Sequence, residues 1–236
     1  MKLRNKIMLG AALAMVAMQT TRAAIYLSDL TGADGRSNGS EITVGDKTFS
    51  GFSYQASGLT GFDASQITVS AYIGADGVYY LSWGGSIALV SGGPAIADLL
   101  LGYTVTANPG QIVGIDQSYV GSGTPLGGTF LAVDETVNAG AVTVGYSHLE
   151  RGDLSDPPGE TIQGDMLVID PPQSTLTVTK DISLAINSFS GGLVSISEVT
   201  QSFHQVPEAS TMIAGALLLL PLGASTLRIL RRNRMP

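Results

Sequence analysis

Short runs of β-branched, aromatic and aliphatic residues alternate along the chain with glycine-rich turns, at intervals of about ten residues. Long stretches with helical periodicity are absent, and the one helix candidate, residues 94–101, fits a buried strand better because it leads into Tyr103-Thr104-Val105. The pattern predicts an all-β fold, a single antiparallel β-sandwich, jelly-roll-like, over residues 24–205. Strands are expected at residues 41–44, 48–55, 66–73, 78–83, 87–90, 99–107, 111–119, 128–136, 141–149, 165–169, 176–187 and 193–203.

The clearest of these strands is the one that begins at Leu176. Apolar residues recur there at every second position, with threonine and serine between them, so one face is expected in the core. Lys180 interrupts the apolar face. We interpret it as a residue at a bulge, at a strand edge or at the rim of the sandwich, where its amine reaches water.

The next strand, at residues 193–203, is expected to pair with this one. Ser190-Gly191-Gly192 has the composition of a hairpin turn between the two. The second strand has its own interruption, at Glu198. The hairpin would therefore bring Lys180 and Glu198 near each other at a bend.

The N-terminus, residues 1–23, has the three parts of a secretory signal peptide. Lys2, Arg4 and Lys6 form a positive region, residues 7–18 an apolar region, and Thr21-Arg22-Ala23 a cleavage site with small residues. The apolar region is shorter than a comfortable membrane span. An uncleaved N-terminal anchor is the alternative.

The C-terminus contains an apolar run at about residues 212–230, whose only charge is Arg228. As a helix it would be roughly 28 Å long, about one hydrocarbon thickness of a bilayer. Basic residues follow it and should stay in the cytoplasm, which places the main domain on the other side of the membrane. The basic stop consists of Arg228, Arg231, Arg232 and Arg234.

A proline-containing motif precedes this run: Val206, Pro207, Glu208, Ala209 and Ser210. With the helix and the arginines, residues 206–236 resemble the PEP-CTERM sorting signal, although Ala209 replaces the usual second proline. The resemblance implies recognition by exosortase, a membrane transpeptidase, followed by removal of the helix and display at the cell surface or release. An ordinary C-terminal anchor that is never processed is the alternative.

Composition changes once both ends are set aside. Residues 24–206 contain four basic and eighteen acidic residues, a formal net charge of −14. Such a domain is repelled by nucleic acid, and cations or neutral sugars are more plausible partners. The chain has no cysteine, which excludes disulfides and thiol chemistry, so hydrophobic burial has to stabilise the fold.

Catalytic motifs are absent. A serine hydrolase of the nucleophile-elbow type needs Gly-x-Ser-x-Gly and a histidine base, and no such elbow occurs. His204 is expected to be a lone exposed side chain. His148 precedes Glu150, Asp153 and Asp156, but a catalytic zinc site usually has more histidine or cysteine ligands. We expect no catalytic residue, no metal and no cofactor.

Two acidic loops offer several oxygen ligands of the kind that calcium prefers. Their candidate ligands are Asp34, Asn38 and Glu41 in the first loop and Asp153, Asp156 and Glu160 in the second. Neither loop has the spacing of an EF-hand. Solvated turns explain the same composition, because aspartate, asparagine, glycine and proline are the residues that turns require.

Aromatic residues gather in the strand at residues 78–83, where Tyr79, Tyr80 and Trp83 occur. Aromatic rings on a sheet can stack on sugars, but packing in the core is the commoner role. Ice binding would need a regular array of threonines, and the row Thr175, Thr177, Thr179 is too short for one.

The observations favour an exported, surface-displayed or secreted non-catalytic β-sandwich, an extracellular-matrix or exopolysaccharide-associated structural or adhesion protein. The link to polysaccharide comes from the PEP-CTERM resemblance, because exosortase systems often accompany exopolysaccharide genes. Expected partners are the secretion machinery, the membrane before processing, exosortase and extracellular polysaccharide. The alternative is a secreted polysaccharide hydrolase that uses paired carboxylates, for which a groove with two converging acids would be needed.

Overall fold

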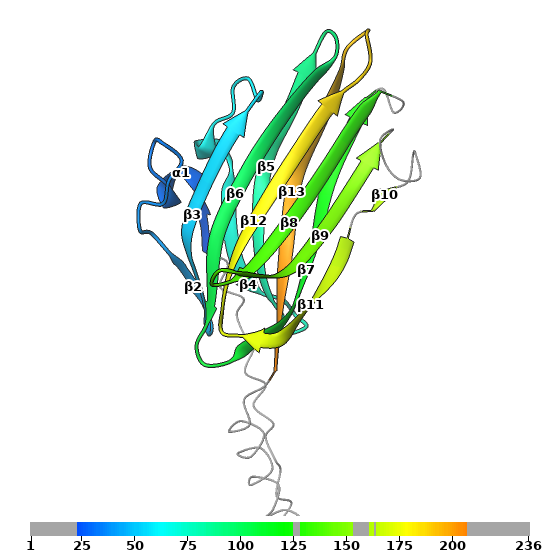
Figure 1. The fold of residues 1–236 in the computed structure, drawn as a ribbon. Helices are drawn as coiled ribbons and strands as arrows, with labels where there is room; N and C mark the ends of the chain where they lie inside the picture. The colour runs from blue at the N-terminus through cyan, green and yellow to red at the C-terminus, as the bar shows by residue number, and fades with distance from the viewer. Residues whose placement is uncertain (1–22, 125–127, 153–160, 163, 207–236) are drawn as a thin grey trace, which may run out of the picture.

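The computed structural model describes residues 23–124, 128–152, 161–162 and 164–206, which form two antiparallel sheets packed face to face (Figure 1). The six-stranded sheet contains, in spatial order, β1 (Ala23–Tyr26), β4 (Thr68–Ile73), β5 (Tyr79–Ser91), β13 (Gly192–Val206), β7 (Gln111–Thr124) and β11 (Gly164–Gln173). The seven-stranded sheet contains β10 (Thr161–Ile162), β9 (Val142–Gly152), β8 (Thr129–Ala139), β12 (Thr175–Ile186), β6 (Ala95–Ala107), β3 (Lys47–Ser57) and β2 (Ile42–Val44). The predicted all-β sandwich is thereby confirmed.

Within the described residues, helical structure is limited to two short elements, α1 (Leu27–Leu30) and the 3-10 helix η1 (Ala64–Gln66). The helix candidate at residues 94–101 belongs to β6, so the strand interpretation is confirmed. The two strands expected at residues 78–83 and 87–90 form one continuous strand, β5. The strands β1 and β10 were not predicted, because they have too few residues to show an alternating pattern.

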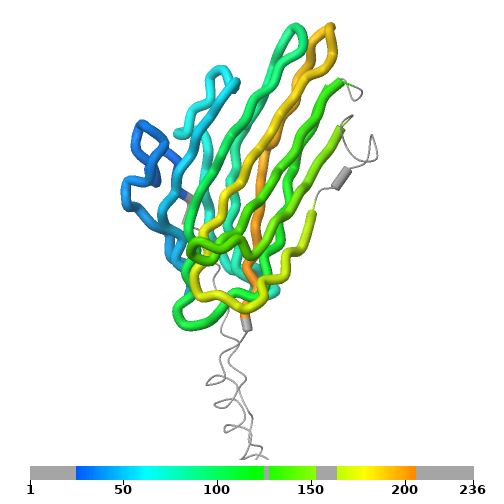
Figure 2. Tube along the Cα trace, in the orientation of Figure 1, coloured from blue at the N-terminus to red at the C-terminus, as the bar shows by residue number. Residues whose placement is uncertain are grey.

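The predicted hairpin between β12 and β13 is wrong. β12 pairs with β6 and β8, whereas β13 pairs with β5 and β7 in the opposite sheet. Figure 2 shows the chain passing from one layer to the other between these strands, in yellow and orange. Gly191 lies in this connection with φ 79°, and a Cβ there would stand 2.2 Å from the carbonyl oxygen of Ser91, so glycine permits the crossing.

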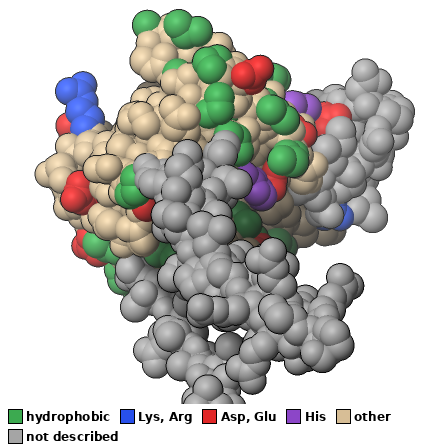
Figure 3. Space-filling model, turned by 90° about the horizontal axis from the view of Figure 1, so that it is seen from below, with side chains coloured by type: hydrophobic (Ala, Val, Ile, Leu, Met, Phe, Trp, Pro, Cys, Tyr) green, Lys and Arg blue, Asp and Glu red, His purple; other side chains and the backbone are tan. Residues whose placement is uncertain are grey.

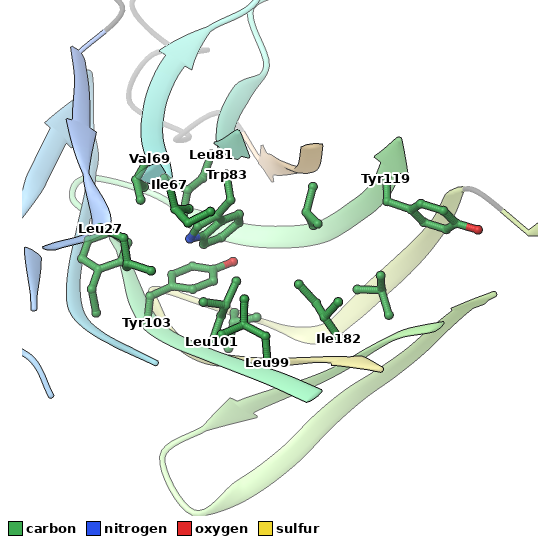
Figure 4. Packing of buried hydrophobic residues seen from close by; sticks show 14 of the residues in the cluster. Leu27, Ile67, Val69, Leu81, Trp83, Leu99, Leu101, Tyr103, Tyr119 and Ile182 are labelled. Carbon is green, nitrogen blue, oxygen red and sulfur yellow. The ribbon is translucent and has the colours of Figure 1, made fainter. Parts of the chain in front are cut away.

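Large apolar side chains from both sheets fill the space between them. Trp83 of β5 packs against Tyr103 of β6, with ring centroids 5.2 Å apart, and Leu99, Leu101 and Ile182 lie beside them (Figure 4). Trp83 is only 2% exposed, which confirms its predicted place in the core. Burial of this apolar surface, about 25 cal/mol per Å², is the main stabilising contribution in a chain without disulfides.

The interpretation of Lys180 as a rim or bulge residue is wrong. β12 is a central strand without a register shift, and the Lys180 side chain is completely buried. Glu198 is not its neighbour, because it lies in the other sheet, where β13 has a bulge between Ile196 and Glu198. Glu198 accepts a hydrogen bond from Thr200, and the partner of Lys180 is Glu135 of β8.

The predicted targeting segments fall mostly outside the described residues. The signal peptide up to residue 22 and the tail from residue 207 are not described, and β13 ends at Val206. Among the helices of the described ranges, none has the length and apolar character needed to span a membrane.

Candidate functional site

Five outward-facing side chains form a row across the outer face of the six-stranded sheet. The strand registers place them side by side on β4, β5, β13, β7 and β11. The row consists of Tyr72, Tyr80, Ser202, Asp116 and Met166. An aromatic pair therefore stands at one end of a line of polar atoms, and an exposed methionine stands at the other.

The two tyrosines of the row form a stacked aromatic pair. Their rings stack at 5.1 Å between centroids with an interplanar angle of 11°. The Tyr80 hydroxyl donates to Asp76 Oδ2 at 2.7 Å, and this hydrogen bond, with partial burial, raises the pKa of Tyr80 to about 12. The phenol stays protonated at neutral pH. Tyr80 was expected in the core, but it lies on the outer face, partly exposed.

Asp116 collects the hydrogen bonds at the centre of the row. Its Oδ2 contacts His204 Nε2 at 2.7 Å and accepts a hydrogen bond from Ser202 Oγ at 3.1 Å. Its Oδ1 is buried and has no hydrogen-bond partner among the described residues. His204 is therefore not the lone exposed side chain that the sequence led us to expect. The Asp116 side chain as a whole is 38% exposed, so the accessible part of its carboxylate can accept a hydrogen bond from a ligand hydroxyl.

These three side chains do not form a Ser-His-Asp catalytic triad. In a triad, the two ring nitrogens of the histidine contact different partners, one the serine and the other the aspartate. Here His204 Nε2 contacts both Ser202 Oγ, at 3.1 Å, and Asp116 Oδ2. This nitrogen cannot accept a proton from serine while it donates to aspartate, so the cluster is a hydrogen-bonding group and not a relay.

An open groove of about 480 Å³ runs along this part of the sheet. Tyr80 and Met166 lie at its two sides, and Asp116, Asp165, Thr200 and Ser202 supply polar atoms; Gln117, Ser118 and Gly164 complete its lining. Aromatic surface combined with a few fixed hydrogen-bonding groups is the usual composition of a sugar-binding surface or other small-ligand site. We refer to it as the Tyr80 groove.

The outer face of the seven-stranded sheet carries a second polar cluster. Asp134 Oδ1 accepts hydrogen bonds from His148 Nδ1, at 2.7 Å, and from the Tyr146 hydroxyl. His148 Nε2 lies 3.2 Å from Glu150 Oε2. Burial alone would lower the pKa of His148, but these two carboxylates raise it above its ordinary value. Figure 3, a view from below, shows histidine side chains with acidic side chains beside them.

No group of three or more metal-ligating side chains with suitable geometry occurs among the described residues, this cluster included. His148 does contact Glu150, as its sequence neighbourhood indicated. Asp153 and Asp156, the other two carboxylates of that candidate, lie outside the described ranges, as does Glu160 of the second candidate calcium loop.

The first candidate calcium loop contains ordinary turn interactions. Asp34 Oδ1 accepts from the Arg36 backbone nitrogen at 3.1 Å, and Asn38 Oδ1 accepts from the Ser40 nitrogen at 2.8 Å. The Asn38 amide donates to the carbonyl oxygen of Asp29. Glu41 is exposed and lies next to β2. Asp34 and Asn38 are thus engaged with the backbone of their own loop, as in solvated turns.

A neutral hydroxyl array covers the other half of the seven-stranded face. The registers align threonine, serine and asparagine side chains in two rows, one of Thr43, Thr48, Thr106 and Thr175 and one of Ser50, Thr104, Thr177, Asn138 and Thr143. Neighbouring hydroxyls lie within hydrogen-bond distance, for example 3.4 Å between Thr104 and Thr177. The threonine row of β12, too short in the sequence, is thus part of a wider array.

No family model and no curated protein matches the chain. Among solved structures, it is similar to the enzymatically active domain of tailspike protein 4 of bacteriophage CBA120, with a TM-score of 0.26 and 13% identity over 66% of this chain and 19% of that one. It is also similar to a glycosylation-associated protein (Gap123) complex from Streptococcus agalactiae (TM-score 0.22, 11% identity, 80% and 46% covered). A third is a carbohydrate-binding module of the β-sandwich superfamily (TM-score 0.17, 9% identity, 79% and 98% covered). These likenesses are too distant to carry an argument about function.

The sequence alone did not group the residues of the Tyr80 groove with one another or with the adjacent His204. Asp116, Ser202 and His204 are separated by up to 88 positions in the chain, and only the pairing of β7 with β13 brings them together. One signal was present: Tyr72 follows Ala71 and Tyr80 precedes Leu81, and a period of two places each tyrosine on the face opposite its aliphatic neighbour.

Proposed function

We propose that the protein is an exported, non-catalytic β-sandwich that binds neutral extracellular polysaccharide through the Tyr80 groove. The observation that carries the proposal is the groove in which the stacked Tyr72–Tyr80 pair lies on the same open surface as the partly exposed carboxylate of Asp116. Sugar rings offer an apolar face to an aromatic ring and hydroxyl donors to a carboxylate.

The charge of the domain supports a neutral ligand. Residues 24–206 have a formal net charge of −14, and two of their four basic residues, Lys47 and Lys180, are fully buried. Arg36 and Arg151 are left as the only basic side chains outside the core, so anionic polymers are repelled. A neutral glucan or xylan is not repelled by this charge.

Delivery is the second part of the proposal. A signal peptide at residues 1–23 would export the chain, and an exosortase would recognise residues 206–210 and remove the following helix. The support is the order of these features in the sequence, together with an acidic domain that has no cysteine. Mass analysis of the mature protein from its native host tests this part: the segment after the motif should be absent, and an intact C-terminus would overturn the processing step.

Affinity gel electrophoresis tests the binding site. The full chain should be retarded in gels that contain hydroxyethyl cellulose or xylan and not in gels that contain alginate, which is anionic. Tyr80→Ala should abolish most of the retardation. Tyr146→Ala is the matched control, because Tyr146 is also an exposed tyrosine bonded to an aspartate, but on the other sheet. Equal retardation of the wild type and Tyr80→Ala would refute the assignment.

The same preparations distinguish binding from hydrolysis. Asp116 and Asp165 both line the groove, which is the observation that a polysaccharide hydrolase with paired carboxylates would need. We expect no release of reducing ends from either polysaccharide. If the wild type releases reducing ends and Asp116→Asn does not, the protein is a hydrolase and the proposed binding function is wrong.

A second candidate function is ice binding, favoured by the hydroxyl array on the seven-stranded sheet. Its side chains repeat at about 4.8 Å between strands and about 6.8 Å along them, as sheet geometry dictates. Thermal hysteresis measured with the wild type and with Thr104→Lys tests it, because Thr104 lies at the centre of the array. A freezing point equal to that of buffer eliminates this function.

A further inference from the structure

Four polar side chains meet in the interior of the sandwich, away from both outer faces. Lys180 and Glu135 are direct neighbours on β12 and β8, and Gln117 and Gln201 are direct neighbours on β7 and β13 of the facing sheet. None of the four is more than 2% exposed. Gln117 also belongs to the lining of the Tyr80 groove, but its side chain is buried, and the function proposed above uses none of these four side chains.

Their contacts are specific. Lys180 Nζ donates to Gln117 Oε1 at 2.9 Å and to Glu135 Oε2, and the same carboxylate oxygen accepts from Gln201 Nε2. The Tyr103 hydroxyl donates to Gln201 Oε1 and thereby fixes the orientation of that amide. On the other side, Gln117 Nε2 donates to Ser147 Oγ at 2.6 Å, which leaves Gln117 Oε1 facing the lysine.

As an ion pair, this cluster leaves polar atoms unsatisfied. Glu135 Oε1 is buried and has no partner among the described residues. Lys180 as an ammonium has three protons, and the described residues offer it two acceptors. Charges buried away from bulk solvent tend to neutralise by proton transfer, and burial does lower the pKa of Lys180, although Glu135 opposes the shift. The neutral state places a free amine against a carboxylic acid.

We propose that Lys180 and Glu135 condense to an intramolecular amide that crosslinks β12 to β8. The neutral amine attacks Glu135 Cδ and forms the Nζ–Cδ bond. Gln201 Nε2 donates to the oxygen that becomes negative, and Gln117 Oε1 holds a proton of the attacking amine. A proton passes from Nζ to Oε1, the Cδ–Oε1 bond breaks, and one water leaves; no oxidant or cofactor is consumed.

The product satisfies every atom that the ion pair leaves open. The remaining N–H of the amide donates to Gln117 Oε1, its carbonyl oxygen accepts from Gln201 Nε2, and the unpartnered Oε1 has left as water. Fixed neighbours on adjacent strands have effective molarities that reach about 10⁵–10⁸ M, which favours condensation inside the fold over hydrolysis. The bond would link positions 45 residues apart in a chain that has no disulfide.

Peptide mass spectrometry of the full chain, denatured and digested with trypsin, tests the proposal. The peptide 48–151 should be joined to the peptide that contains Lys180, with a total mass one water below the sum, and no cleavage should occur after Lys180. Lys47 is the internal control: it is equally buried beside Asp46, its neighbour in sequence, and should be cleaved normally.

The wild type alone decides the outcome, so a variant that does not fold leaves the test intact. Separate linear peptides, one of which ends at Lys180, would overturn the proposal. A joined pair that has lost one ammonia instead of one water would also overturn it, because the bond would then be to Gln117. In Lys180→Arg, the linked species should be absent and cleavage after residue 180 restored.

Discussion

The strands β8 and β12 carry two charged pairs on consecutive residues, and the two pairs face opposite environments. Glu135 and Lys180 are in register and point into the core, where both are buried. Asp134 and Asp181 are also in register and point outward. The inner pair has opposite charges and the outer pair has like charges, although the two pairs occupy adjacent positions along each strand.

The difference shows how solvent decides which charges a sheet accepts. Outside, Asp134 is stabilised by hydrogen bonds from His148 and Tyr146, and water screens its repulsion of Asp181. The remaining cost is visible at Asp181, whose pKa is raised by partial burial and by the charges of Asp98 and Asp134. Inside, both side chains are withdrawn from bulk solvent, so complementary partners or a chemical bond have to satisfy the groups.

The largest expected effect comes from removing one member of the inner pair. Lys180→Met leaves the carboxyl of Glu135 buried without its partner, and we expect the free energy of unfolding to fall by at least about 3–5 kcal/mol. Guanidinium unfolding followed by fluorescence of Trp83, the single tryptophan, measures the change.

Removing both members provides the control for this experiment. Lys180→Met combined with Glu135→Leu eliminates the orphaned carboxyl and should recover part of the lost stability, because apolar side chains can fill the same space. A single variant as stable as the wild type would show that the inner pair does not need complementarity, and the contrast between the two faces would disappear.

A smaller and opposite effect is expected on the outer face. Because the folded protein raises the pKa of Asp181, ionisation of this carboxyl destabilises the fold at neutral pH. Asp181→Asn should raise the free energy of unfolding by about 0.2–1 kcal/mol at pH 7, the range for like charges on facing strands. The gain should shrink as the pH falls through the raised pKa of the folded state and should disappear below the ordinary value of 3.8.

Glu41→Gln removes an exposed carboxylate away from the cluster and serves as the control for Asp181→Asn. It should change stability by less than the cluster variant at pH 7. If the two variants are equal, the effect comes from net charge alone and not from the pairing of Asp181 with Asp134.

The smallest effect is a pH dependence that depends on His148. Its pKa is raised in the folded state, so the protonated ring stabilises the fold fully below its ordinary value of 6.5 and this contribution is lost as the pH rises through the folded pKa. The melting temperature of the wild type should therefore decline above pH 6.5. His148→Gln should flatten this decline, and an unchanged pH profile would contradict the contribution of the outer cluster.

The sequence predicted the strands better than their partners. The alternation from Leu176 to Ile186 identified the buried face of β12 correctly, because a period of two is a property of one strand. The same pattern misplaced Lys180, because its acidic partner lies 45 residues away on a strand that no local signal connects to it. A turn composition at Ser190-Gly191-Gly192 likewise could not show that the chain changes sheets there.

The candidate sites were also limited by what the sequence shows of strand pairing. Both histidines were noticed, but His204 acquired its role only when the pairing of β13 with β7 brought it to Asp116. The threonines of β12 were visible in the sequence, whereas the side chains that extend them into an array lie on other strands, such as β3, β6 and β9. Export and sorting are different, because the signal peptide and the sorting motif are local in sequence. Both remain predictions for the segments at the two ends.

A crystal structure of the exported protein, at a resolution that separates single atoms, tests the contrast between the two faces most directly. We expect continuous electron density between Lys180 Nζ and Glu135 Cδ, with no atom at the position of Oε1, and separate carboxylates at Asp134 and Asp181. Two unconnected side chains in the core, with Oε1 present and bonded to an ordered water, would contradict the account.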